Sequence, residues 1–337
     1  MQKKYLILIL TFLSGIIFTH VYADDLPIAN TVTKSVQTQN VISENAAAKS
    51  ALIKNKNISQ QKKSAQDINK YLTKMIEVKN SALQKRISAE NKVKSNPYAI
   101  NFYEQTYVLP YYYTFNPYKE IYSTITPDNQ PVKSNEFKAQ FSIQVPLWSR
   151  INNKAIELRF GYTQLMFWQF YARNQYFRET DYQPELFVNW HALSNWMVRF
   201  GAVHESNGRG GEYERSWNRL YTDVRFSGNH WLFSIKPWVL IFRPQSSNLH
   251  NSDIADYLGH GRLLFAYKAH SLVLSFWERN AFESLFRRAS YQADISFRIH
   301  GYLYGYIQYF TGYGQSLIEY NHKTKAVGIG IIISNWL

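Results

Sequence analysis

Apolar and polar residues alternate with a period of two from about Pro97 to the end of this chain. The alternation is strict in three segments, IELRFGY at 156–162, YQADISFRI at 291–299 and VGIGIII at 327–333. A period of two predicts strands with one apolar and one polar face, because successive side chains of a strand point to opposite sides. No segment after the N-terminal apolar run is long and apolar enough to cross a bilayer as a helix.

The pattern predicts about twelve antiparallel strands. They lie near residues 106–115, 136–148, 153–168, 184–192, 195–206, 215–227, 230–242, 255–268, 270–279, 288–299, 301–310 and 323–334. An even number of strands is expected of a transmembrane barrel whose two termini lie on the same side. A closed barrel pairs every strand edge and therefore satisfies its backbone groups without water.

Two all-β folds are compatible with the alternation. One is a soluble sandwich or barrel with its apolar face inward, and the other is a transmembrane antiparallel β-barrel with its apolar face outward. The transmembrane barrel is favoured because the polar face near 215–225 carries charge along its whole length, at Arg215, Arg219, Asp223 and Arg225. Aromatic residues also gather near predicted strand ends, as in interfacial girdles. They include Tyr111, Tyr112, Tyr113, Trp196 and Trp231. The chain also ends on an apolar segment with Trp336 next to last, close to the aromatic-ended final strand typical of outer-membrane barrels.

The N-terminal part differs in composition from the rest. Lys3, Lys4, the apolar run 5–18 and the small residues at 21–23 predict a signal peptide over 1–23. Residues 24–96 are rich in Lys, Asn, Ser, Ala and Gln, and they predict a basic, low-complexity extension that is flexible or partly helical. This extension is either a solvated spacer or a segment that contacts anionic headgroups or peptidoglycan. The barrel domain is then 97–337, and with no cysteine in the chain it contains no disulfide.

A histidine and a serine occupy the face that is expected to meet lipid. His204 and Ser206 continue an alternating set whose members at 196, 198, 200 and 202 are Trp, Val, Phe and Ala. Their Cα atoms should be roughly 6.6 Å apart on one face of the strand. Asn218 falls on the outward face of the next strand. Because a serine nucleophile needs a base, and the base needs an orienting group, we predict Ser206 as nucleophile, His204 as general base and Asn218 as orienting residue.

A His-x-Ser pair alone is a weak signal, for which interfacial hydrogen bonding is the alternative, but two further positions extend it. The turn after Ser206 contains Gly208, whose backbone N–H can approach a developing oxyanion. Gln164 shares the lipid-facing side of its strand with Phe160 and Tyr162. An amide in hydrocarbon needs a partner, which a symmetry mate in a two-fold homodimer would supply. A glutamine that reaches the membrane interface is the alternative.

These residues closely resemble the signature of the outer membrane phospholipase A family. The resemblance rests on His204, SNGR at 206–209 and RSWNR at 215–219, and it extends to VPLW at 145–148, YTQ at 162–164, FRET at 177–180, KPW at 236–238 and GYGQSLI at 312–318. It covers nearly all of 97–337 and none of 24–95. It implies a twelve-stranded barrel in the outer membrane of a Gram-negative bacterium. It also implies a calcium-dependent phospholipase A1/A2 and lysophospholipase, active as a homodimer, with its active sites on the barrel exterior and no nucleic-acid partner.

The implied calcium site is where this sequence departs from the family. The resemblance implies ligation by the carbonyl of Arg209 and by a carbonyl near Asn174 of the partner subunit. A calcium-bound water then completes the oxyanion hole. The family's aspartate two residues after Arg209 is Gly211 in this chain, and its serine ligand falls at Glu214. Since calcium prefers several oxygen ligands, we expect Glu214, helped by Glu212, to restore the lost charge. Two solvated loop carboxylates are the alternative.

Two other functions are compatible with the sequence. One is a different lipid hydrolase, such as a lipopolysaccharide deacylase built on a His-Ser barrel. The other is a non-catalytic, porin-like barrel, since charged lumen positions allow a narrow channel. About twelve strands leave little open space once side chains fill the interior.

Overall fold

The computed structural model describes residues 56, 60, 62–64, 66–70, 81–93, 100–149, 156–193, 195–241, 250–301 and 303–337. The predicted signal peptide and most of the predicted extension lie outside the described residues. The chain divides into two units, Met1–Ala65 and Gln66–Leu337, and the second contains all the elements discussed below. Within the described ranges, no helix combines the length and hydropathy of a membrane-crossing segment.

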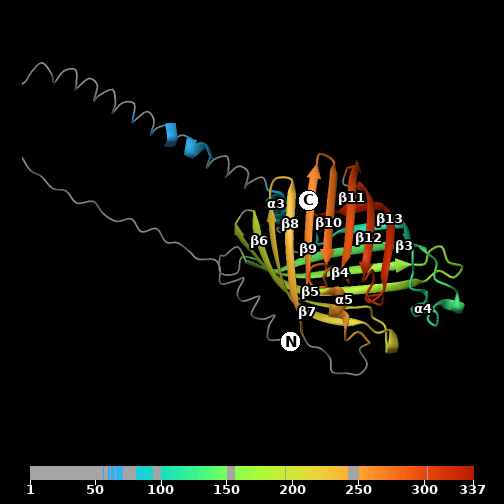
Figure 1. Ribbon diagram of the computed structural model, residues 1–337. Helices are drawn as coiled ribbons and strands as arrows, with labels where there is room; N and C mark the ends of the chain where they lie inside the picture. Colours follow the sequence, from blue (N-terminus) through green and yellow to red (C-terminus); the bar gives the residue numbers. More distant parts are fainter. Residues whose placement is uncertain are drawn as a thin grey trace, which may run out of the picture. The chain divides into compact units, whose positions relative to one another are not determined.

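The second unit is built around a closed antiparallel barrel of twelve strands, β2–β13 (Figure 1). Each strand pairs with its neighbours in sequence, and the pairing of β13 with β2 closes the ring. The strands are β2 (Thr106–Thr114), β3 (Asn135–Ser149), β4 (Ile156–Trp168), β5 (Phe177–Leu193), β6 (Trp196–Ser206), β7 (Ser216–Ser227), β8 (Trp231–Ile241), β9 (Gly261–Ala269), β10 (Leu272–Arg279), β11 (Ser290–His300), β12 (Leu303–Tyr313) and β13 (Lys323–Ser334). The predicted fold class and strand number are confirmed.

Three features of the strand prediction were wrong. A short strand, β1 (Asn101–Phe102), pairs with β3 and was not predicted. β5 begins at Phe177, seven residues before the predicted start at 184. The predicted strand 255–268 begins only at Gly261, because the residues before it form a short helix, α5 (Ile254–Leu258).

The helix α5 is held by contacts that a local pattern does not contain. The side-chain amide of Asn280, in the loop after β10, donates to the carbonyls of Asp256 and Tyr257 at 3.0 and 2.9 Å. Ile254 and Leu258 are buried in a cluster that includes side chains from β5, β6 and β7. Alternation of residue types could therefore not distinguish this turn of helix from the start of a strand.

The barrel is apolar outside and polar inside. Large side chains exposed on the outer wall occur on every strand from β2 to β13 and include Tyr111, Phe141, Phe160, Leu186, Phe200, Leu220, Ile235, Phe265, Leu274, Ile295, Ile307 and Ile329. The inner wall carries buried ion pairs. Arg178 binds Glu136, and Arg225 binds Asp223, with N···O distances of 2.8 and 2.7 Å. Charged groups buried in this way are paired, as a water-poor interior requires.

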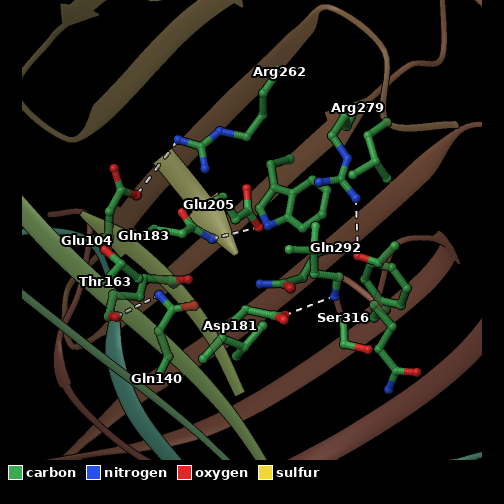
Figure 2. Close-up of a pocket in the computed structure, with 18 of the residues that line it drawn as sticks. Glu104, Gln140, Thr163, Asp181, Gln183, Glu205, Arg262, Arg279, Gln292 and Ser316 are labelled. Atoms are coloured by element: carbon green, nitrogen blue, oxygen red, sulfur yellow. Dashed lines mark hydrogen bonds and ion pairs between the residues drawn. The ribbon is translucent and has the colours of Figure 1, made fainter. Parts of the chain in front are cut away.

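The barrel interior is filled rather than open. Its side chains leave a cavity of about 160 Å³. Figure 2 shows polar groups from many strands around this cavity, with Glu104 and Arg262 on one side and Asp181 on the other. A volume of this size holds a few water molecules. At this level, among the residues that the structure describes, side chains fill most of the interior.

The two ends of the barrel differ. Short turns and the C-terminus lie at one end, where helix α3 (Ala82–Val93) packs, while α5 lies at the other end (Figure 1). The backbone N–H of Ala82 donates to the carbonyl of Gly228 at 2.8 Å, so α3 contacts the β7–β8 turn. Trp336 is buried inside the barrel against Leu232 and Leu264. β13 ends at Ser334, two residues before Trp336, and the chain then turns inward, so Trp336 follows the final strand instead of lying on it.

The long loops extend the barrel at the end opposite to α3. They carry α4 (Lys119–Tyr122) and the 3₁₀ turns η1 (Pro127–Asn129) and η3 (Gly211–Tyr213). The predicted catalytic and calcium-binding residues lie at or near this end, on β6, β7 and the loops that follow β4 and β6.

Candidate active site

His204 and Asn218 lie directly opposite each other on β6 and β7. His204 Nδ1 and Asn218 Oδ1 are 2.9 Å apart. An amide oxygen can only accept a hydrogen bond, so Nδ1 carries the proton in this arrangement and Nε2 keeps its lone pair. The imidazole is exposed on the outer wall, on the same face as the exposed Phe200. The pair therefore presents a potential base to the surroundings of the barrel.

Ser206 ends β6 two residues after His204 and is half-buried on the same face. It pairs with Tyr182 of β5 on one side and with Ser216 of β7 on the other. No hydrogen bond joins Ser206 to His204 among the described residues. Catalytic hydrogen bonds are often loose without substrate, and the spacing of two strand positions keeps the hydroxyl near the imidazole.

The inner wall behind this face is tied together by Glu205, which lies between His204 and Ser206 and points into the barrel. Its carboxylate accepts from Trp217 Nε1 at 2.8 Å and from Gln183 Nε2 at 3.0 Å, and it also binds Arg219. Figure 2 shows the Gln183 contact. Glu205 thus links β5, β6 and β7. Sequence reasoning did not identify this residue, although a carboxylate between two candidate catalytic positions was a visible signal.

The loop after β6 is closed by the buried side chain of Asn207. Its amide nitrogen donates to Glu179 Oε1 at 3.0 Å and to the carbonyl of Tyr213 at 2.8 Å. Its amide oxygen accepts from the backbone N–H groups of Arg209 and Arg215. These bonds join the two ends of the segment 207–215 and fix the backbone that follows Ser206. This role of Asn207 was not predicted from the sequence.

Gly208 has a φ of 64°, a left-handed conformation that favours glycine. A Cβ at this position would lie 3.0 Å from Cε2 of Tyr182. Gly208 is therefore required both by its backbone conformation and by the neighbouring ring. Gly210, two residues further on, has an ordinary φ of −110°, and a Cβ at that position would have no neighbour within 4 Å.

Three of the predicted calcium ligands, Arg209, Glu212 and Glu214, lie on this loop and offer oxygen atoms suited to a cation. Arg209 fixes its guanidinium to Glu179, with Nε and Oε2 2.8 Å apart, and its carbonyl oxygen accepts no hydrogen bond from the described residues. The carboxylate of Glu214 is half-buried, that of Glu212 is exposed, and neither has a hydrogen bond or ion pair within the described part of the chain. Gly211, at the position of the family's aspartate, has a φ of 63°.

Within the described residues, His, Cys, Asp and Glu side chains form no group of three or more that could hold a metal ion. Asn174 lies on a different loop, between β4 and β5, where its carbonyl accepts from Gln130 Nε2 at 2.6 Å. Its side chain also donates to Asp128. A carbonyl has two lone pairs, so this contact leaves the Asn174 oxygen able to accept a further partner.

Gln164 lies on the outer wall of β4. Its Oε1 accepts from the hydroxyl of Tyr162 at 3.0 Å, while its amide NH₂ has no partner among the described residues. The cross-strand partners of Gln164 are Phe141 on β3 and Tyr182 on β5. An amide donor pair therefore faces outward from an apolar surface.

Comparison with known proteins gives consistent matches. The family model described as Phospholipase A1 matches residues 83–333. The chain is 33% identical over 249 residues to Phospholipase A1 of Klebsiella pneumoniae, covering 71% of this chain and 84% of that protein. It is 32% identical over 249 residues to Phospholipase A1 of Escherichia coli K12, covering 71% and 83%.

Two solved structures resemble the barrel closely. One is the Salmonella typhi outer membrane phospholipase dimer with bound calcium, with a TM-score of 0.66 and 32% identity over 73% of this chain and 96% of that chain. The other is outer membrane phospholipase A from Escherichia coli, with a TM-score of 0.65 and 31% identity over 72% and 94%.

Proposed function

The chain belongs to the phospholipase A1 family of outer-membrane ester hydrolases, and we propose that it cleaves phospholipid acyl esters with Ser206, His204 and Asn218. The observation that carries this proposal is the 2.9 Å contact between His204 Nδ1 and Asn218 Oδ1 on the outer wall. Exposing a polar pair of this kind to lipid costs free energy, so its presence on this surface indicates a function there. The proposed site thus meets its substrate in the leaflet itself.

The proposed reaction is acyl transfer to water. His204 Nε2 removes the proton of the Ser206 hydroxyl as Oγ attacks the ester carbonyl carbon. The imidazolium then protonates the departing glycerol oxygen, leaving an acyl ester on Ser206. Water, deprotonated by the same nitrogen, attacks this ester, and Oγ regains its proton as the fatty acid leaves. Asn218 holds the imidazole in the required orientation but, being neutral, stabilises imidazolium less than a carboxylate would.

The backbone N–H of Gly208 is the proposed donor to the oxyanion that forms in both steps. The buried contacts of Asn207 hold this segment in place before substrate binds. A donor that is already positioned loses no free energy to reorganisation during the reaction.

Calcium is the proposed cofactor, held by the carbonyl of Arg209, the carboxylate of Glu214 with help from Glu212, and a carbonyl at Asn174 of the partner subunit. The unpaired loop carboxylates support this assignment, because calcium prefers several oxygen ligands. When bound, the cation supplies positive charge near the oxyanion. Because one of the proposed ligands comes from the partner subunit, calcium binding and dimerisation should depend on each other.

The proposed active state is a homodimer with Gln164 at its interface. The amide NH₂ of Gln164 has no acceptor among the described residues, and a symmetry-related copy would supply one, which supports this proposal. Because the site opens to the side, towards lipid, both diacyl and monoacyl phospholipids can reach it. We therefore propose phospholipase A1, A2 and lysophospholipase activities in one site.

The N-terminal assignments are also proposals. Residues 1–23 are the proposed signal peptide, 24–96 the basic extension and 97–337 the catalytic barrel. The helix α3 falls within the proposed extension and contacts the barrel. N-terminal sequencing of the protein from outer membranes tests the cleavage site.

Substitution of Ser206 tests the proposed function. Ser206→Ala protein should fold and insert as the parent does but release no fatty acid from phospholipid or lysophospholipid vesicles with calcium present. Ser252→Ala, at an exposed loop position, is the matched control and should retain full activity. Wild-type rates from Ser206→Ala protein would refute the assignment. Release of fatty acid only from lipopolysaccharide would indicate the deacylase, and ion conductance without hydrolysis would indicate a porin.

A further inference from the structure

The loop between β10 and β11 displays three large apolar side chains. Phe282, Leu285 and Phe286 are 67%, 73% and 62% exposed. These fractions exceed that of Phe276 on the outer wall of β10, which is 44% exposed. We call Phe282, Leu285, Phe286 and the adjacent Arg287 the β10–β11 tip. No step of the proposed reaction uses it.

The tip is held in a defined conformation. The N–H of Phe286 donates to the carbonyl of Ala281 at 2.7 Å, and the N–H of Arg288 donates to Ser284 Oγ at 3.0 Å. Leu285 and Phe286 have φ values of 50° and 65°, a left-handed conformation that bulky residues rarely adopt. The surrounding hydrogen bonds thus hold these two side chains outward at a conformational cost. A backbone conformation of this kind points to a function for the exposed surface.

The acidic side chain of the loop, Glu283, is engaged by contacts within the protein. His260 Nδ1 lies 2.6 Å from Glu283 Oε1, and the His260 backbone N–H donates to Oε2 at 2.8 Å. Partial burial by itself would raise the pKa of Glu283, but the bonds and charge of His260 outweigh it and hold that pKa below its usual value. Glu283 is therefore occupied by an internal contact.

The basic side chains differ from each other. Arg288 packs over the Tyr257 ring, with its guanidinium carbon 4.4 Å from the ring centroid, and lies 3.6 Å from Asp256. Arg287 is exposed, and its guanidinium makes no hydrogen bond or ion pair with any described residue. The tip therefore combines three exposed apolar side chains with one cation that has no partner among the described residues.

The position of the tip excludes a role in the proposed dimer interface and a role in the proposed active site. β10 is the sixth strand from β4 in either direction around the ring, so the tip lies on the opposite side of the barrel from Gln164. A dimer centred on Gln164 would not cover it. The tip is also three strands from β7, which carries Asn218. Next to the tip, the outer-wall rings of Phe276 and Tyr291 stack with centroids 6.1 Å apart, as expected where a barrel wall meets the membrane interface.

We propose that the β10–β11 tip is an anchor that inserts into the lipid leaflet around the barrel, with Arg287 bound to a lipid phosphate. The apolar side chains enter the acyl-chain region, where their exposure to water ends. A guanidinium offers paired donors that match phosphate oxygens, so anionic phospholipid strengthens insertion. The anchor fixes the tilt and depth of the barrel on the side opposite to the proposed dimer interface.

The absence of cysteine in the chain allows a direct test. Leu285→Cys protein carries a spin label on the tip, and Ser252→Cys protein carries the same label on an exposed loop as the control. Full-length protein is reconstituted in phosphatidylcholine vesicles containing phosphatidylglycerol. For each label we measure the ratio of its collision rate with oxygen to its collision rate with a water-soluble nickel chelate. This ratio should be several-fold higher for the Leu285→Cys label than for the Ser252→Cys control. Equal ratios at the two positions would overturn the proposal.

A second pair of variants tests the phosphate contact. In the labelled background, Arg287→Gln should abolish the increase in insertion that phosphatidylglycerol produces over pure phosphatidylcholine, and Arg287→Lys should keep part of it. Calcium-dependent hydrolysis of detergent-solubilised substrate should be unchanged in all these variants, which separates this proposal from the catalytic one. An unchanged lipid response in Arg287→Gln protein would contradict the phosphate contact. A tip that stays in water in vesicles but is shielded in native membranes would contradict lipid insertion and indicate a protein partner instead.

Discussion

Tyr182 and Ser206 are directly opposite each other across β5 and β6, and Tyr182 also pairs with Gln164 across β4 and β5. One row of side chains on the outer wall therefore joins the proposed dimer residue to the proposed nucleophile. With strands about 4.8 Å apart, Gln164 and Ser206 are separated by roughly 10 Å. A second copy of the chain that contacts Gln164 would therefore lie next to Ser206. In the proposed homodimer, this geometry would couple assembly to catalysis.

Replacing Gln164 should weaken the dimer. Gln164→Leu removes the amide and should cost about 1 kcal/mol of association free energy, or about fivefold in the dimer dissociation constant. Crosslinking and hydrolysis, measured over a range of protein-to-detergent ratios, should shift together. Thr222→Val makes a similar polar-to-apolar change on the outer wall of β7 and should shift neither. A loss of activity at full dimer occupancy would argue against this role for Gln164.

The contact between His204 and Asn218 should be visible as energetic coupling. Asn218→Ala should lower kcat by at least about 100-fold, because the imidazole loses its orientation. In a His204→Ala background the same substitution should have almost no further effect, since Asn218 acts only through the imidazole. Initial rates on a phospholipid substrate for the four variants measure this cycle. Additive losses would mean that Asn218 acts independently of His204.

Two glycines of one loop should respond differently to alanine. Gly208→Ala forces a methyl group into a left-handed position 3.0 Å from the Tyr182 ring, and it should lower kcat by about tenfold or more by displacing the oxyanion donor. Gly210→Ala meets no neighbour and should keep parental kcat. Thermal unfolding of both proteins shows whether the fold is retained. Equal effects of the two substitutions on kcat would contradict the proposed role of Gly208 in the oxyanion hole.

The carboxylate of Glu214 should set the calcium requirement. Glu214→Gln should raise the calcium concentration for half-maximal activity on the order of tenfold, and Glu212→Gln should raise it less. Saturating calcium should restore most of the activity, because the catalytic residues are intact. Glu120→Gln, on the exposed surface of α4, is the control for loss of one negative charge. An unchanged calcium titration for both loop variants would mean that neither carboxylate binds calcium.

Much of this protein could be predicted from local patterns. A period of two in residue polarity determined which side chains of β4, β6 and β11 face outward, because a strand has only two faces. The same alternation placed His204 and Ser206 on one face and Asn218 on the next strand. Strand ends were predicted less well where contacts from distant loops determine the local structure. One example is α5, which was predicted as strand and whose carbonyls accept hydrogen bonds from Asn280.

The tertiary structure decided how these faces meet. Sequence spacing could not establish that His204 lies opposite Asn218, because strand register depends on pairing along the whole hairpin. The position of Glu205 between two candidate catalytic residues was visible in the sequence, but the partners of Glu205 and Asn207 were not, because they come from β5, β7 and the loop between β6 and β7. The alternation of polar and apolar residues along the chain determined which face of its strand a side chain occupies. The pairing of strands, which no short segment of sequence specifies, determined which side chains lie next to each other.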